Sequence, residues 1–116
     1  MMPYPVKVRK DPKEFHRVTK DALKIIWAKA KGWRCRFIFE DKTRYYWGDK
    51  LKKFYAYVLA SGLFIRLHDS HVARIDALAD YRAGFAVLCT GKEIPVSRKM
   101  REAVKQIVEA NRNFRP

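Results

Sequence analysis

The residue types best suited to chemistry in this sequence are basic and aromatic side chains, which alternate between Trp33 and Leu67. Arg and Lys side chains neutralise phosphates, whereas the flat rings of Tyr, Phe and Trp stack on nucleic-acid bases. This pattern predicts a nucleic-acid-binding surface on the solvent side of the stretch. The residues expected to form it are Arg34, Arg36, Arg44, Tyr46, Lys50, Lys52, Lys53 and Tyr57.

Two histidines in the segment His68-Asp69-Ser70-His71 could serve as metal ligands or as an acid and a base. Residues three apart share one face of a helix, but a metal site needs further ligands from elsewhere in the chain. Cys35 and Cys89 lack the CxxC spacing that would supply them. The sequence therefore predicts no metal site, and we expect both thiols to be buried and free.

The acidic residues offer one further possibility, a metal-dependent nuclease built on Glu40-Asp41-Lys42 with Asp69 as a partner. Two-metal chemistry needs carboxylates that converge in a cleft, whereas Asp and Lys are ordinary residues at the tip of a turn. The sequence also lacks the glycine-rich phosphate-binding loops and the GxSxG nucleophile motif. We therefore expect no catalytic residues, no enzymatic activity and no cofactor, and the nuclease stays an alternative.

The charge balance points to an anionic partner. The chain has 26 Lys and Arg residues against 12 Asp and Glu, a formal net charge of +14. The excess is +6 over residues 1–32, +5 over 33–68 and +3 over 69–116. Such a field attracts polyanions, so the expected partner is nucleic acid, either DNA or RNA. The alternative is a small inhibitor or adaptor protein that docks on an acidic, nucleic-acid-handling protein complex.

The length of 116 residues and the composition indicate a single domain over residues 1–116. Residues 1–10 are expected to be a basic extended arm, because two prolines disfavour a helix there. No apolar run reaches the roughly 18 residues of a membrane span, and the N-terminus lacks the apolar core of a secretory signal. With only two cysteines, we expect a cytoplasmic protein that has no membrane partner.

A β-hairpin over residues 33–47 is predicted to position the basic and aromatic side chains. Apolar and basic residues alternate from Trp33 to Phe39 with the two-residue period of a strand, and Asp41-Lys42-Thr43 supplies a turn. On this pattern Arg34 and Arg36 face solvent. The residues expected in the core are Trp33, Cys35, Phe37, Phe39, Trp47 and Phe54.

The predicted fold class is α+β, with a small antiparallel sheet packed against three or four helices. The sheet consists of the hairpin 33–47 and a strand over 63–67. The first helix is predicted over 12–31, because Asp11 can act as its N-cap and apolar residues follow at helical spacing.

The remaining segments are assigned by the same criteria. Residues 50–60 fit both a helix and a strand, and we favour the helix because Gly62 can end it. Further helices are predicted over about 70–83 and 98–112. Residues 85–89 fit either a buried strand or a continuation of helical packing.

Overall fold

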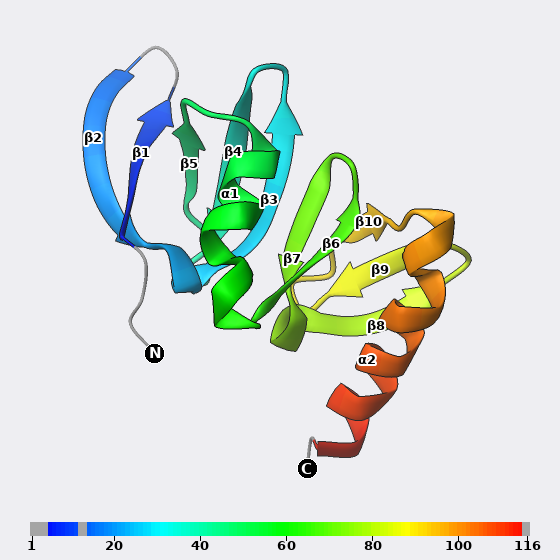
Figure 1. Cartoon of the computed structure of the whole chain (residues 1–116). Helices are drawn as coiled ribbons and strands as arrows, with labels where there is room; N and C mark the ends of the chain where they lie inside the picture. The colour runs from blue at the N-terminus through cyan, green and yellow to red at the C-terminus, as the bar shows by residue number, and fades with distance from the viewer. Residues whose placement is uncertain (1–4, 12–13, 115–116) are drawn as a thin grey trace.

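The computed structural model describes residues 5–11 and 14–114, and strands dominate this part of the chain. The ten strands are β1 (Pro5–Asp11), β2 (Glu14–Asp21), β3 (Ile25–Lys31), β4 (Arg34–Phe39), β5 (Arg44–Trp47), β6 (Phe64–His68), β7 (His71–Arg74), β8 (Leu78–Arg82), β9 (Phe85–Leu88) and β10 (Glu93–Pro95). The two α-helices are α1 (Leu51–Val58) and α2 (Arg101–Phe114) (Figure 1). Short 3-10 turns join some of these elements: η1 (Ala22–Lys24), η2 (Leu59–Ser61), η3 (Ile75–Ala77) and η4 (Arg98–Met100).

The strands form two antiparallel sheets. Seven strands make a large sheet in the order β2-β1-β5-β4-β3-β7-β6, and three make a small sheet in the order β10-β9-β8. Within the large sheet, Phe37 of β4 pairs with Ala28 on one side and Tyr45 on the other. Because side chains alternate along each strand, the sheet has two distinct faces. We call the face covered by α1 the front face and the opposite one the back face.

The front face is apolar and lies under α1 (Figure 1). Leu51, Phe54 and Val58 are the buried residues of α1, and they form one stripe along the helix. The ring centroid of Phe54 lies 4.7 Å from that of Phe37 on β4. A helix of eight residues is not stable by itself, so packing against the sheet is what holds α1 in place.

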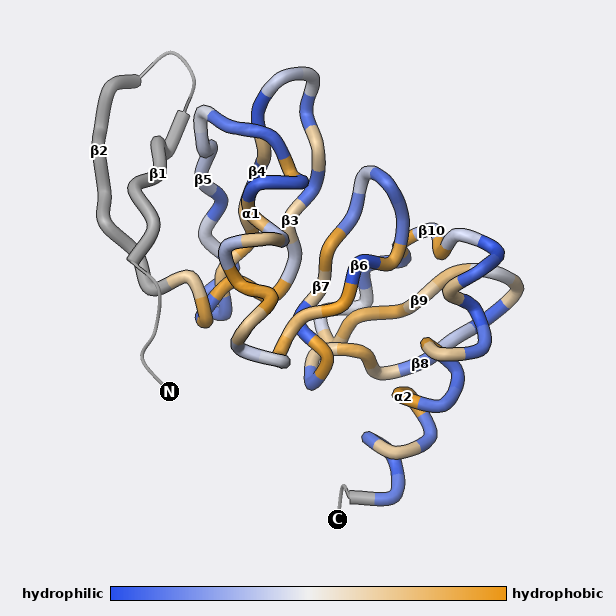
Figure 2. Tube along the Cα trace, in the orientation of Figure 1, coloured by the Kyte–Doolittle hydropathy of each residue, from blue (hydrophilic) through white to orange (hydrophobic). Residues whose placement is uncertain are grey.

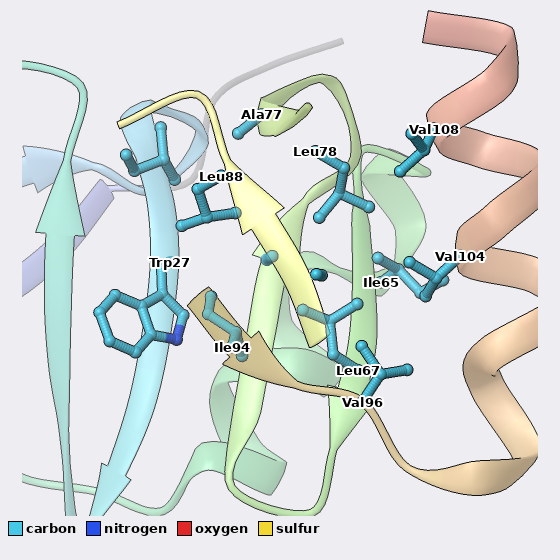
Figure 3. Close-up of a cluster of buried hydrophobic side chains, with 13 residues drawn as sticks. Trp27, Ile65, Leu67, Ala77, Leu78, Leu88, Ile94, Val96, Val104 and Val108 are labelled. Atoms are coloured by element: carbon cyan, nitrogen blue, oxygen red, sulfur yellow. The ribbon is translucent and has the colours of Figure 1, made fainter. Parts of the chain in front are cut away.

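The small sheet covers part of the back face and forms a second core with it (Figure 3). This core includes Trp27 and Ile65 of the large sheet, Leu88 and Ile94 of the small sheet, and Val104 and Val108 of α2. The side-chain amide of Asn111 donates hydrogen bonds to two backbone carbonyls, one in η3 and one in β8. These bonds fix α2 against the small sheet.

The predicted small sheet with three or four helices is wrong. The segment 12–31, predicted as a helix, forms β2, η1 and β3 instead, so Asp11 ends a strand and caps no helix. The reason lies in β3, which is covered on both faces: Ile25 belongs to the front core and Ile26 to the back core. A strand buried on both faces shows no two-residue alternation, and its continuous apolar run also fits a helical stripe.

The predicted helix over 70–83 is also wrong, because this segment forms β7, η3 and β8. The chain passes from the large sheet to the small one at η3. The helix-like spacing of Val72, Ile75 and Leu78 therefore arises from two short strands interrupted by a 3-10 turn. Residues 5–10 of the predicted arm belong to strand β1, which pairs with β2, and residues 1–4 lie outside the described residues.

Several other predictions are confirmed. The structure contains the hairpin 33–47, a helix within 50–60, a strand near 63–67 and the last helix. For residues 85–89 the sequence left a strand and helical packing open, and residues 85–88 form a strand. Gly62 follows η2 with a φ of 68°, in the left-handed region that glycine favours. Neither α1 nor α2 is long and apolar enough to cross a lipid bilayer.

The burial predictions hold for most of the hairpin. Cys35, Phe37 and Phe39 are buried, whereas Arg34 and Arg36 are partly exposed. Two predictions are wrong: Trp33 is 65% exposed, and Cys89 is an exposed thiol in the β9–β10 turn. Trp33 differs because it lies in the β3–β4 turn, beyond the end of the front core.

Candidate nucleic-acid interface

Turns from three parts of the chain meet along one edge of the molecule, at the upper end of the large sheet in Figure 1. The amide of Ala30 donates a hydrogen bond to the carbonyl oxygen of Ser70 at 2.9 Å, which joins the β3–β4 and β6–β7 turns. The amide of Ser97 donates to the carbonyl oxygen of Leu67 at 2.8 Å, which places η4 beside them. These backbone bonds fix three distant segments on one surface.

We call this surface the edge surface. Its residues are Lys31, Trp33, Arg34, Asp49, Lys50, Arg66, His68, Asp69, Arg98 and Lys99. Six of them are cationic and two are carboxylates, and one carboxylate, Asp49, lies 3.4 Å from the Nζ atom of Lys53. The turns β3–β4 and β6–β7 are coloured from white to blue in Figure 2, whereas orange gathers in the middle of the molecule. The edge surface is therefore polar and positively charged.

The β3–β4 turn presents a row of aromatic and basic side chains. Gly32 has a φ of 63°, which allows the tight reversal between the two strands. The guanidinium carbon of Arg34 lies 5.6 Å from the ring centroid of Trp33 and 5.1 Å from that of Tyr46. Both rings can attract the cation, and none of the ion pairs found among the described residues involves Arg34.

Two histidines flank the β6–β7 turn, with ring centroids 5.8 Å apart. The Nδ1 atom of His71 accepts a hydrogen bond of 3.0 Å from Nε1 of Trp27. Burial, and next the neighbouring His68, lower the pKa of His71 to about 4, so its ring is neutral at neutral pH. The Nδ1 atom of His68 accepts a bond from the amide of Ser70 at 3.2 Å. His71 is therefore structural, and His68 is the ring available at the surface.

A cleft of about 240 Å³ opens on the edge surface between α1, β6 and η4. Arg66, His68, Ser97 and Lys99 are among the residues that line it. The Nη2 atom of Arg66 donates to the carbonyl oxygen of Asp69 at 2.9 Å. The buried Nε of Arg66 and the buried Oγ of Ser97 have no hydrogen-bond partner among the described residues. Since buried polar atoms are normally paired, these two donors suit an anionic ligand.

The eight residues predicted to contact a ligand do not form one surface. The register places Arg34, Arg36, Arg44 and Tyr46 together on the back face of β4 and β5. Exposed side chains on the outer side of α1 lie across the sheet from them, and these are Lys52, Lys53 and Tyr57. Lys50 precedes α1 and lies at the edge. The large sheet thus divides the predicted set between its two sides.

Sequence reasoning missed the contribution of the second half of the chain to this edge. Arg66, Arg98 and Lys99 were not among the expected contacts, and His68 was considered only as a metal ligand or as an acid or base. Among the described residues, no group of three or more His, Cys, Asp or Glu side chains could hold a metal ion. One sequence signal could have indicated this contribution: Arg98 and Lys99 are adjacent cations just before the last helix, and helix starts bind anions readily.

No protein-family model and no curated protein matches this sequence. The fold itself is known from a solved structure, described as the LytTr DNA-binding domain of a methyl-accepting/DNA response regulator from Bacillus cereus. The two structures agree with a TM-score of 0.69 and 16% sequence identity, over 90% of this chain and 97% of that one. At this identity the likeness shows a shared fold, and it agrees with the strand-rich architecture described above.

Proposed function

We propose that this protein binds double-stranded DNA through the edge surface. The observation that carries the proposal is that cations, an exposed tryptophan and unpaired polar donors gather on turns held together by backbone hydrogen bonds. Phosphates are bound by Arg and Lys side chains and by helix starts, while side chains on projecting elements reach base edges in the grooves. The solved structure with the same fold is a DNA-binding domain, which favours DNA over RNA.

The residues of the edge surface are assigned two roles. Arg98, Lys99 and the donors of the cleft contact phosphates, because they surround the start of α2, where the helix dipole favours negative charge. Trp33 and Arg34 enter a groove, because they project from a turn with the guanidinium already held between two rings. Because Arg34 is already held in one position, less conformational entropy is lost when it binds DNA.

The proposal keeps only part of the contact set expected from the sequence. Arg34, Tyr46 and Lys50 stay in it, because they lie at or beside the edge surface. Lys52, Lys53 and Tyr57 are left out, because they lie on the outer side of α1. Neither the adaptor nor the nuclease alternative has a supporting observation in the fold or in the comparisons.

The test is a fluorescence-anisotropy titration of a labelled DNA duplex at several salt concentrations. We expect the double substitution Arg98→Ala/Lys99→Ala to weaken binding about tenfold or more and to lower the salt slope by about two units. The matched control is Lys52→Ala/Lys53→Ala, which removes the same charge from the outer side of α1. The control should stay within about twofold of the wild type, because those lysines make no phosphate contact.

Two outcomes would contradict the proposal. If both double variants weaken binding equally, net charge alone accounts for the affinity and the edge surface is not the interface. If the wild-type protein binds no duplex at near-physiological salt, DNA binding itself is ruled out, and a pull-down with and without nuclease treatment would look for a protein partner.

A further inference from the structure

A cavity on the back face takes no part in the proposed DNA contact. It encloses about 210 Å³ between the back face of β3, β4 and β5 and the β9–β10 turn. We call it the back pocket. Its cationic residues are Arg36, Lys42, Arg44 and Lys92, and its apolar residues are Ile26, Trp27, Ile38 and Leu88. Lys42 lies in the β4–β5 turn and Arg44 is the first residue of β5, at the opposite end of these strands from the edge surface.

The apolar residues form a floor and the cations form a mouth. Ile26, Trp27 and Leu88 are each at most 5% exposed, whereas Lys42, Arg44 and Lys92 are exposed. Figure 3 shows Trp27 on β3 facing the region of Leu88 on β9, where the two sheets meet. The pocket therefore offers a small apolar surface surrounded by positive charge.

The cations of the back pocket have no carboxylate partner among the described residues. The two carboxylates nearest in the sequence are engaged elsewhere: Glu40 pairs with Arg74. Asp41 accepts hydrogen bonds from the amide and the hydroxyl of Thr43 at 3.0 and 2.5 Å. The Nε atom of Arg36 is buried and has no partner in the described structure. An anion in the pocket would supply the missing counter-charge.

Repulsion between neighbouring cations is visible at Lys29, which lies on the same face of β3 as Trp27. Burial, followed by the charges of Arg36, Lys31 and Lys92, lowers the pKa of Lys29 below its usual value. A ligand anion would reduce this repulsion as well as pairing with the mouth of the pocket.

The indole of Trp27 is fixed in place, and the small part of this residue that is exposed, 5%, lies at the floor of the pocket. Its only polar atom, Nε1, is bonded to Nδ1 of His71 at 3.0 Å, within the sheet. The Nζ atom of Lys92 lies 5.6 Å from the centroid of the ring. An apolar ligand body can therefore contact the ring while its charged group meets Lys92 and Arg44.

We propose that the back pocket binds a small organic anion, a carboxylate or a phosphate carried on an aromatic or branched apolar body. The pocket is smaller than the roughly 300–1,000 Å³ sites that hold drug-sized ligands, so one ring and one charged group suit its volume. The apolar floor provides the selectivity for an organic anion over inorganic phosphate. This inference does not depend on DNA binding, because a different surface carries that proposal.

The test follows the indole and amide resonances of the ¹⁵N-labelled protein by NMR during titration with four probes: phenyl phosphate, benzoate, inorganic phosphate and benzyl alcohol. We expect phenyl phosphate, benzoate or both to shift the Trp27 indole resonance and the amides of residues 36–38 and 88–92 with saturation. Inorganic phosphate should bind at least tenfold more weakly, and benzyl alcohol should not saturate. The head group that binds more tightly identifies the class of anion.

Substitutions then test whether the cations of the back pocket bind the probe. Arg44→Gln/Lys92→Gln changes two exposed side chains, so the fold should persist, and it should weaken the tighter organic probe at least tenfold. The control Lys52→Gln/Lys53→Gln should bind this probe like the wild type. Equal binding of inorganic phosphate and phenyl phosphate would overturn the inference, as would saturation by benzyl alcohol or shifts confined to other residues.

A DNA duplex distinguishes the back pocket from the edge surface. Added to protein saturated with the tighter organic probe, the duplex should shift resonances of the edge surface and leave the probe bound. Displacement of the probe would mean that the pocket cations belong to a nucleic-acid surface, and the inference of a small-molecule site would fail. Failure of the duplex to bind at all would contradict the DNA proposal and leave the probe titration as the measure of the pocket.

Discussion

The front and back faces of the large sheet consist of alternate residues of the same strands, yet they have opposite properties. On β4, Cys35, Phe37 and Phe39 point to the front and are buried. Arg34 and Arg36 point to the back and stay partly exposed. The front face is covered by α1, and the back face is covered by the small sheet only in part. What covers each face, and how far, therefore decides whether it becomes core or a ligand surface.

The same contrast between a covered and an uncovered surface exists between two parts of the back face. Beneath the small sheet it holds Trp27 and Ile65 in an apolar core. Beyond the small sheet the same face carries Arg36, Arg44 and Tyr46. The back pocket lies where the two parts meet, which explains why it combines an apolar floor with a cationic mouth.

The largest expected difference between covered and uncovered sites concerns the thiols. Burial, followed by the charge of Asp49, raises the pKa of Cys35 to about 12, whereas Cys89 is exposed in the β9–β10 turn. A pKa near 12 reduces the thiolate fraction about 1,000-fold relative to an ordinary cysteine. In the folded protein a thiol reagent should therefore label Cys89 at least about 1,000-fold faster than Cys35, as peptide mass spectrometry over time can measure. Comparable labelling rates for Cys35 and Cys89 would show that local unfolding exposes the front face to the reagent.

The next largest effect concerns the stability contributed by the front face. Phe37→Ala removes a fully buried ring packed against Trp47 and Phe54, so the free energy of unfolding should fall by about 3–5 kcal/mol. The matched change on the back face, Arg36→Ala, should alter it by about 0.5 kcal/mol at most. Urea unfolding of the two variants measures both, and similar losses would contradict the distinction between the faces.

The covered part of the back face should show a pH dependence through His71. Its folded pKa of about 4 lies below the unfolded value of about 6.5. Between these values the unfolded chain binds more protons, so stability is highest above pH 6.5 and falls as the pH drops towards 4. The loss should reach up to about 3 kcal/mol, as urea unfolding at several pH values would measure.

A single variant tests whether His71 causes this pH dependence of stability. His71→Gln keeps an acceptor for the indole of Trp27 without a titrating ring, and it should reduce the fall in stability between pH 6.5 and 4. An unchanged pH profile in this variant would assign the effect to groups other than His71.

The smallest effect concerns Trp33, at the uncovered end of the sheet. Trp33→Ala should change the free energy of unfolding by no more than about 0.5 kcal/mol, because the side chain is 65% exposed. If the edge surface contacts DNA, the same change should cost about 1 kcal/mol of binding free energy, or roughly fivefold in affinity. Urea unfolding and duplex titration of the one variant measure both. A loss of stability with unchanged affinity would place Trp33 in the fold rather than in the interface.

Local patterns predicted part of this structure correctly, and they did so where only one side of an element is buried. The hairpin 33–47 and α1 were recognised because each has one apolar and one polar side, so their periodicity is visible. Strands β3 and β7 were mistaken for helices because both of their faces are covered, which removes the alternation.

The positive charge, the lack of catalytic motifs and the faces of β4 were determined by the sequence itself, because composition and two-residue alternation are local properties. Which cations share a surface was decided only by the tertiary structure. The backbone bonds from Ala30 to Ser70 and from Ser97 to Leu67 bring three turns to one edge. The large sheet separates Arg36 and Arg44 from Lys52 and Lys53, although all four lie within 18 consecutive residues. Contacts between residues far apart in sequence depend on how the strands pair, and no local spacing encodes that pairing.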